Sequence, residues 1–155
     1  MKCLAVLAAT AVLSLNAAYA GQYQVSRSVE LSSSPEEAWK MIGDFCDIDD
    51  WHPAISTCAL KSIDGGVHRV IEVDGIGEFV EKLVATDPSG LNYTYSIVSS
   101  PAPFDRYTGT LSITRGNPST LTWASRFSTD DPGLEAAVGG LYEAGLTAIK
   151  AALSA

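Results

Sequence analysis

Few side chains of this 155-residue chain have a type and position that suit proton transfer. Glu81, His52, Tyr93 and Tyr107 could act as general acids or bases, and Glu81 and His52 are the leading catalytic candidates. Burial raises the pKa of a carboxyl group towards neutrality, whereas an imidazole titrates there without perturbation. The chain has no nucleophile elbow, phosphate-binding loop, zinc-ligand cluster or catalytic triad motif, so we expect no cofactor and no metal.

Arg69 and Glu81 lie on the apolar faces of two consecutive predicted strands. A hairpin register that sets them opposite each other would neutralise both, because a buried charge needs a partner. Glu81 would then be less available as an acid or base. The alternative is that both side chains are solvated. His68 falls on the opposite face from Arg69, and we expect it to be exposed.

Cys46 and Cys58 are the two cysteines that follow the N-terminal apolar stretch. In an oxidising compartment such a pair predicts a disulfide, which would stabilise the fold by about 3 kcal/mol in the chain-entropy model. Two free, buried thiols are the alternative. A metal site that also used His52 would have a spacing that matches none of the usual zinc patterns.

The N-terminus has the three-part layout of a secretory signal peptide. Lys2 supplies a positive charge, Leu4–Leu15 is apolar, and Ala18–Ala20 fits a cleavage site. We therefore predict a signal peptide over residues 1–20, cleavage near Ala20, and a single mature domain over residues 21–155 in the periplasm or outside the cell. No later segment approaches the 18 or so apolar residues of a membrane span.

The formal net charge of −8 repels phosphate backbones, so the composition argues against a nucleic-acid partner. Its simplest consequence is solubility.

Turn-forming residues divide the chain into short elements. Ser34–Glu37 can cap a short helix through a capping box, with Pro35 in the first turn. A second short helix or turn is expected near Asp47–Asp50. The predicted strands are Tyr23–Leu31, Ser56–Ile63, Val67–Val73, Glu78–Asp87, Leu91–Ser99, Arg106–Thr114 and Thr120–Thr129. Short links between the last six predict an antiparallel sheet.

The last three strands alternate apolar and polar residues, which is typical of a sheet covered on one face. A helix over Leu134–Leu153 has an apolar stripe and is long enough, at about 30 Å, to cross that face. Gly145 and Gly139–Gly140 interrupt it at a cost near 1 kcal/mol each. They allow either close packing on the sheet or space for a ligand.

This order of elements is that of an α+β helix-grip fold, in which a curved antiparallel seven-stranded sheet wraps around a long C-terminal helix. Six segments carry a resemblance to a known family: Ser34–Trp39, Ile42–Phe45, Trp51–Pro53, Gly77–Leu83, Tyr93–Ile97 and Trp123. In these segments the sequence resembles the SRPBCC (START-like) superfamily, and within it the polyketide cyclase/dehydrase and lipid-transport family.

The resemblance implies a hydrophobic ligand in a cavity between the sheet and the last helix. His52 would lie at the mouth of this cavity or would be a turn histidine without a chemical task. The segment Ser100–Asp105 would form a rim or an ordinary connection. The expected ligand-binding residues are Trp51, Arg69, Glu81, Tyr93, Tyr95, Tyr107, Trp123, Phe127 and Tyr142.

Three functions are compatible with these residues. The favoured one is non-catalytic binding of a small lipid-, polyketide- or aromatic-like molecule. The second is a cyclase or dehydratase that uses Glu81 with tyrosine or histidine acid–base groups. The third, remote one is an accessory protein of an exported oxidation system. Sequence alone identifies neither the ligand nor a protein partner.

Overall fold

The computed structural model describes residues 20–154, so all of the predicted signal peptide except Ala20 lies outside the described residues. The elements are β1 (Gly21–Leu31), α1 (Pro35–Ile42), α2 (Ile48–Trp51), β2 (Ile55–Ile63), β3 (Gly66–Val73), β4 (Gly77–Asp87), β5 (Asn92–Ser99), β6 (Asp105–Thr114), β7 (Ser119–Thr129) and α3 (Gly133–Leu153). Their order is the predicted one, and every strand ends at the predicted residue.

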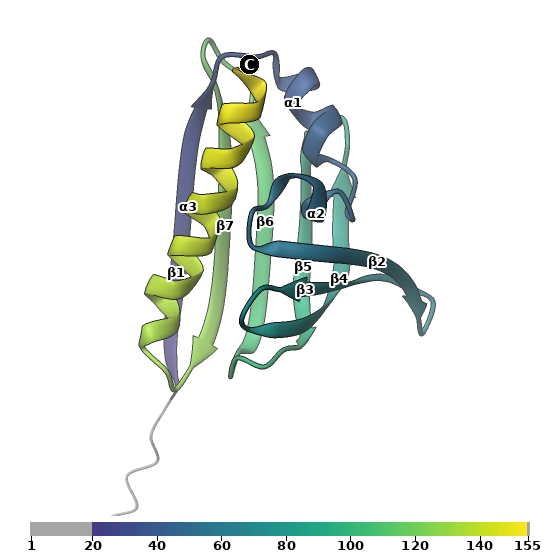
Figure 1. Cartoon of the computed structure of the whole chain (residues 1–155), viewed down its shortest axis with the longest axis vertical. Coiled ribbons are helices and arrows are strands. Elements are labelled where there is room, and N and C mark those ends of the chain that lie inside the picture. The colour runs from purple at the N-terminus through teal and green to yellow at the C-terminus, as the bar shows by residue number, and fades with distance from the viewer. Residues whose placement is uncertain (1–19, 155) are drawn as a thin grey trace, which may run out of the picture.

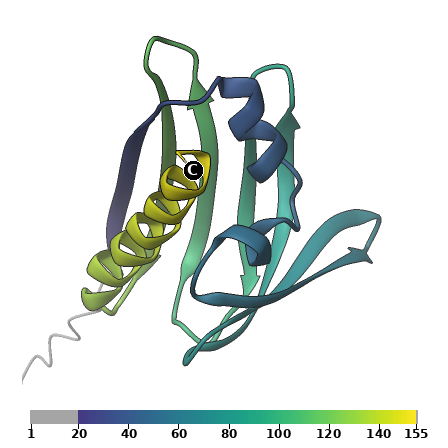
Figure 2. The same cartoon turned by 45° about the horizontal axis from the view of Figure 1, so that its top comes forward.

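The seven strands form one antiparallel sheet in the order β1-β7-β6-β5-β4-β3-β2. The first and last strands pair along their whole length, with Gly21 opposite Thr129 and Leu31 opposite Ser119. The sheet is curved, and the β2–β3 hairpin folds across the same side that carries the helices (Figures 1 and 2). The helix-grip architecture predicted from the sequence is confirmed.

α1 begins with the predicted capping box. The Ser34 hydroxyl accepts a hydrogen bond from the Glu37 N–H at 3.2 Å, and the Glu37 carboxylate accepts one from the Ser34 N–H at 3.1 Å. These bonds satisfy donors that the first turn of a helix cannot satisfy by itself. The cap therefore fixes where the chain turns from β1 into the helical segment above the sheet.

α3 lies along β1 and β7 on the concave side of the sheet (Figure 1). It does not cross the whole face, as its length suggested, because the curved sheet brings α2 and the β2–β3 hairpin over the other half. Its buried stripe includes Val138, Tyr142, Leu146 and Ile149. Within residues 20–154, no helix is long and apolar enough to span a bilayer.

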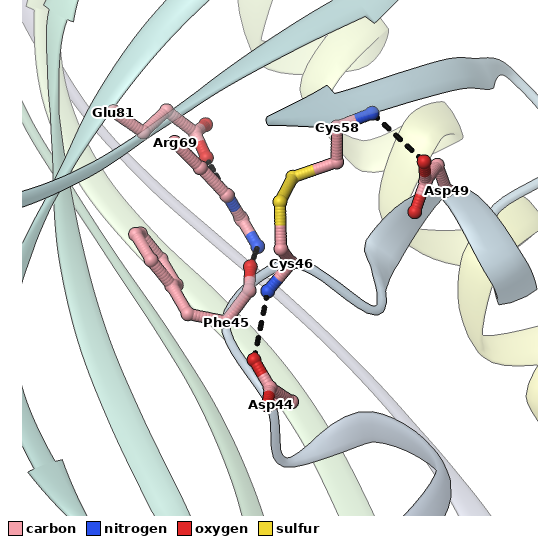
Figure 3. The surroundings of a disulfide bond; sticks show 7 residues. All are labelled: Asp44, Phe45, Cys46, Asp49, Cys58, Arg69 and Glu81. Carbon is pink, nitrogen blue, oxygen red and sulfur yellow. Dashed lines mark hydrogen bonds and ion pairs between the residues drawn. A yellow bond between two sulfur atoms is a disulfide. The ribbon is translucent and has the colours of Figure 1, made fainter. Parts of the chain in front are cut away.

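Cys46 and Cys58 form a disulfide, with their Cα atoms 5.6 Å apart (Figure 3). It joins the α1–α2 connection to β2, so the two sulfurs bind each other and neither is a free thiol or metal ligand. The expectation that His68 is exposed is wrong, because only 5% of it is accessible. Its imidazole donates to the Gly66 carbonyl at 3.1 Å and faces Lys82 across the β3–β4 ladder.

Candidate ligand-binding site

A cavity of about 120 Å³ lies between the concave face of the sheet and α3. Most of its wall is aliphatic or aromatic, as in most small-molecule sites. The wall residues that sequence analysis did not single out as ligand-binding come from α2, four strands, their connections and α3. They are Ile48, Ile55, Ile71, Val73, Ile76, Phe79, Ile97, Ala102, Phe104, Leu134, Ala137, Val138 and Leu141.

Five of the nine predicted ligand-binding residues line this cavity. They are Glu81, Tyr95, Tyr107, Trp123 and Tyr142. The catalytic candidate His52 lines it as well. The structure thus brings residues from β4, β5, β6, β7 and α3 together around one small space.

The other four predicted residues do not line the cavity but pack behind residues that do. Their supporting contacts are Trp51 edge-on to Trp123 at 5.6 Å, Phe127 stacked on Tyr107 at 5.5 Å, Tyr93 tilted against Tyr95 at 6.4 Å, and Arg69 paired with Glu81. The period-2 pattern placed the three strand residues Arg69, Tyr93 and Phe127 on the correct face of the sheet, whereas Trp51 belongs to α2. It could not separate the cavity wall from the layer behind it.

Arg69 and Glu81 form a buried ion pair, as the hairpin register predicted. They stand directly opposite in the β3–β4 ladder, and Arg69 Nε donates to Glu81 Oε2 at 2.6 Å (Figure 3). Arg69 is fully buried and Glu81 is 5% exposed. Burial acts to lower the pKa of Arg69, but the Glu81 carboxylate and nearby tyrosines leave it raised, so the guanidinium stays charged.

Sequence analysis missed the third member of this arrangement, Phe45. Arg69 Nη1 donates to the Phe45 carbonyl at 2.6 Å, and the guanidinium lies 4.3 Å from the centre of the Phe45 ring. Cys46 follows Phe45 and carries the disulfide to Cys58 (Figure 3). Arg69 therefore joins β3, β4 and the α1–α2 connection. A backbone carbonyl carries no sequence signal, so this partner could not be predicted.

His52 has a structural role that its sequence position did not reveal. Its Nε2 donates to the Leu141 carbonyl at 3.0 Å, and its Nδ1 accepts from the Ala54 N–H at 3.1 Å. Burial lowers its pKa, and the charge of Arg69 acts in the same direction. The imidazole is therefore neutral and ties the segment after α2 to α3. Neither nitrogen is left to transfer a proton, which argues against its catalytic assignment.

Four polar groups meet beneath α3 in what we call the tyrosine cluster: Tyr95, Tyr107, Tyr142 and the indole N–H of Trp123. The indole donates to the Tyr95 hydroxyl at 3.0 Å, which lies 3.5 Å from the Tyr142 hydroxyl. The Tyr107 and Tyr142 hydroxyls also hydrogen-bond. Burial raises the pKa of all three phenols, so they stay protonated.

Two glycines let rings approach the backbone at this site. A Cβ on Gly145 of α3 would lie 2.6 Å from His52 Cδ2 and 3.1 Å from Trp123 Cζ3. A Cβ on Gly109 of β6 would lie 2.5 Å from the Tyr95 ring. Gly145 therefore serves close packing, which decides between the two explanations for this glycine.

The cavity meets the surface between the β3–β4 turn, the segment before β6 and the start of α3. Of the wall residues there, Ile76 and Ala137 are exposed, and Ala102, Phe104 and Leu134 are half-buried. Ala102 and Phe104 belong to Ser100–Asp105, so this segment forms part of the rim.

The chain matches the family model described as polyketide cyclase/dehydrase and lipid transport over residues 22–154. It is 30% identical to the protein XoxI from Bacillus cereus, with a TM-score of 0.77, over 84% of this chain and 95% of that one. An uncharacterised protein from Bacillus thuringiensis is 29% identical, with a TM-score of 0.78, over 86% and 100%.

The Zhui aromatase/cyclase from Streptomyces sp. R1128 is 16% identical, with a TM-score of 0.74, over 86% of this chain and 94% of that one. At this level of identity the likeness concerns the fold alone.

Proposed function

Because the chain belongs to the polyketide cyclase/dehydrase and lipid-transport family, we propose that it binds a small hydrophobic molecule in the cavity between the sheet and α3. The observation that carries this proposal is the cavity of about 120 Å³, whose mostly apolar wall includes a few buried polar groups. We propose binding without catalysis, because both nitrogens of His52 and one oxygen of Glu81 already have protein partners.

We further propose that the protein acts in the periplasm. The signal-peptide pattern of residues 1–20 supports this location, and so does the disulfide between Cys46 and Cys58, since disulfides persist in oxidising compartments. Native mass spectrometry of protein recovered from the periplasm would report N-terminal cleavage near Ala20. A full-length chain confined to the cytoplasm would contradict the proposed location.

The mouth of the cavity offers a matched pair of variants for testing binding. Ala136 and Ala137 are adjacent, exposed residues of α3, but only Ala137 lines the cavity. We expect Ala137→Phe to abolish binding of toluene, measured by calorimetry, and Ala136→Phe to leave it unchanged. Absence of toluene binding to the wild-type protein, or equal effects of the two variants, would contradict the proposed site.

A further inference from the structure

The size of the cavity limits what can lie inside it. An engineered apolar cavity of about 150 Å³ in another protein binds benzene, so the 120 Å³ found here has room for about one aromatic ring. Larger ligands would have to extend through the mouth beside Ile76 and Ala137. The group that enters the closed end must therefore be compact.

Among the described residues, the cavity wall includes one carboxylate, that of Glu81, and no cationic side chain. Among the hydrogen bonds of residues 20–154, Glu81 takes part in one, through Oε2, and its Oε1 remains an acceptor. Arg69 neutralises the pair but does not line the cavity. Its Nε and Nη1 donate to Glu81 and Phe45, and its Nη2 is buried without a hydrogen-bond partner in the described part of the chain. A ligand therefore meets the free Glu81 oxygen directly, whereas the positive charge of Arg69 lies behind the cavity wall.

The tyrosine cluster has one hydrogen more than its hydrogen bonds use. The indole of Trp123 donates to Tyr95, and the hydroxyls of Tyr95, Tyr107 and Tyr142 have only two contacts among them. Since each hydroxyl carries one hydrogen, these three contacts use three of the four hydrogens and leave one without an acceptor among them. Ser125 Oγ is also buried without a hydrogen-bond partner within residues 20–154, and it is the protein group that competes with a ligand for this hydrogen.

We propose that the cavity selects an uncharged, hydroxylated ring of about phenol size and rejects carboxylates. This inference rests on the proposed function. The ligand hydroxyl donates to Glu81 and accepts the surplus hydrogen of the tyrosine cluster. It thereby satisfies both the free acceptor and the free donor of the cavity wall. A carboxylate would lie against the Glu81 carboxylate in an apolar space and would have no cation of its own at the wall, because Arg69 lies behind it and already pairs with Glu81; such an arrangement is strongly disfavoured.

Calorimetric titration of the wild-type protein with phenol, toluene and benzoate tests this selection. Phenol adds a hydrogen bond to a charged acceptor, so we expect it to bind roughly ten-fold more tightly than toluene, and benzoate not to bind. Equal affinity for phenol and toluene, or binding of benzoate, would overturn this inference alone. Failure of all three ligands, toluene included, would overturn the proposed function as well.

Glu81→Gln sharpens the test, because the amide replaces one acceptor with a donor while its oxygen can still accept from Arg69. We expect the preference for phenol over toluene to shrink and benzoate binding to appear. A folded variant with an unchanged order of affinities would contradict the role of Glu81. The wild-type series decides the proposal by itself if this variant does not fold.

Discussion

The Arg69–Glu81 ion pair and the tyrosine cluster lie around the same cavity but differ in how completely the protein satisfies their hydrogen bonds. Arg69 and Glu81 carry full charges, and Arg69 holds two strands and the Phe45 carbonyl together through two hydrogen bonds of 2.6 Å. The tyrosine cluster carries no charge, and its four donors have only three contacts with one another. Most donors and acceptors of the Arg69–Glu81 pair are bonded to other protein groups, whereas the tyrosine cluster keeps one donor hydrogen free.

This difference follows from the cost of burial. A charge removed from water must be paired closely, so a buried arginine is bound by several protein partners. A buried hydroxyl costs less and can be left partly unsatisfied where a ligand or water completes it. In this cavity we therefore expect Arg69 to determine stability, and the free Glu81 oxygen together with the tyrosine hydroxyls to determine ligand choice.

We expect the largest change in stability when the Arg69–Glu81 ion pair is broken. Arg69→Met leaves the Glu81 carboxylate buried without a partner and removes the donor to the Phe45 carbonyl. We expect the free energy of unfolding to fall by about 3–5 kcal/mol, measured by urea denaturation. The double variant Arg69→Met/Glu81→Leu should recover most of this loss, because no lone charge remains. A double variant as unstable as the single one would contradict this account of the pair.

A smaller effect tests how closely His52 packs on α3. Gly140→Ala meets no atom within 4 Å and should stabilise the helix by about 1 kcal/mol. Gly145→Ala offers the same helical gain but pushes a Cβ against His52 and Trp123, an overpacking that costs about 1–3 kcal/mol. Thermal unfolding should therefore rank Gly140→Ala above the wild type and Gly145→Ala at or below it. Equal stabilisation by both would show that the ring contact is loose.

The smallest expected effect is on how the free energy of unfolding depends on pH. The pKa of His52 is lowered from 6.5 in the folded protein, chiefly by burial, so the unfolded chain binds a proton more readily. Its contribution to stability is complete above pH 6.5 and decreases as the pH falls below that value. We expect urea denaturation between pH 7 and pH 5 to show a weaker pH dependence for His52→Gln than for the wild type. Identical pH profiles would argue against a buried, neutral His52.

Local patterns predicted most of the fold, because strand alternation, turn residues and the Ser34–Glu37 cap act over short distances. The Arg69–Glu81 pair could also be predicted, since a hairpin fixes which residues face each other. The bonds of His52 to Leu141 and of Arg69 to Phe45 could not, because each ends on a backbone carbonyl distant in sequence. Such contacts depend on how the sheet curves, which alternation does not specify.

The cavity wall was predicted only in part for the same reason. Alternation identifies the inward face of each strand, but the depth of a residue depends on which layer covers it. Tyr93 and Phe127 face inward and lie behind Tyr95 and Tyr107, whereas Val73 and Ile97 reach the cavity. The apolar wall residues of the strands and of α3 carried the periodicity of their elements but no feature that separates a cavity from a packed core.

The central claim is that the space beneath α3 receives a ligand whose polar group faces Glu81. A crystal structure of the protein soaked with phenol tests it most directly. We predict density for one ring between the sheet and α3, with its oxygen about 2.7 Å from a Glu81 carboxylate oxygen. A cavity holding only ordered water at saturating phenol, or a ring bound elsewhere on the protein, would contradict the claim.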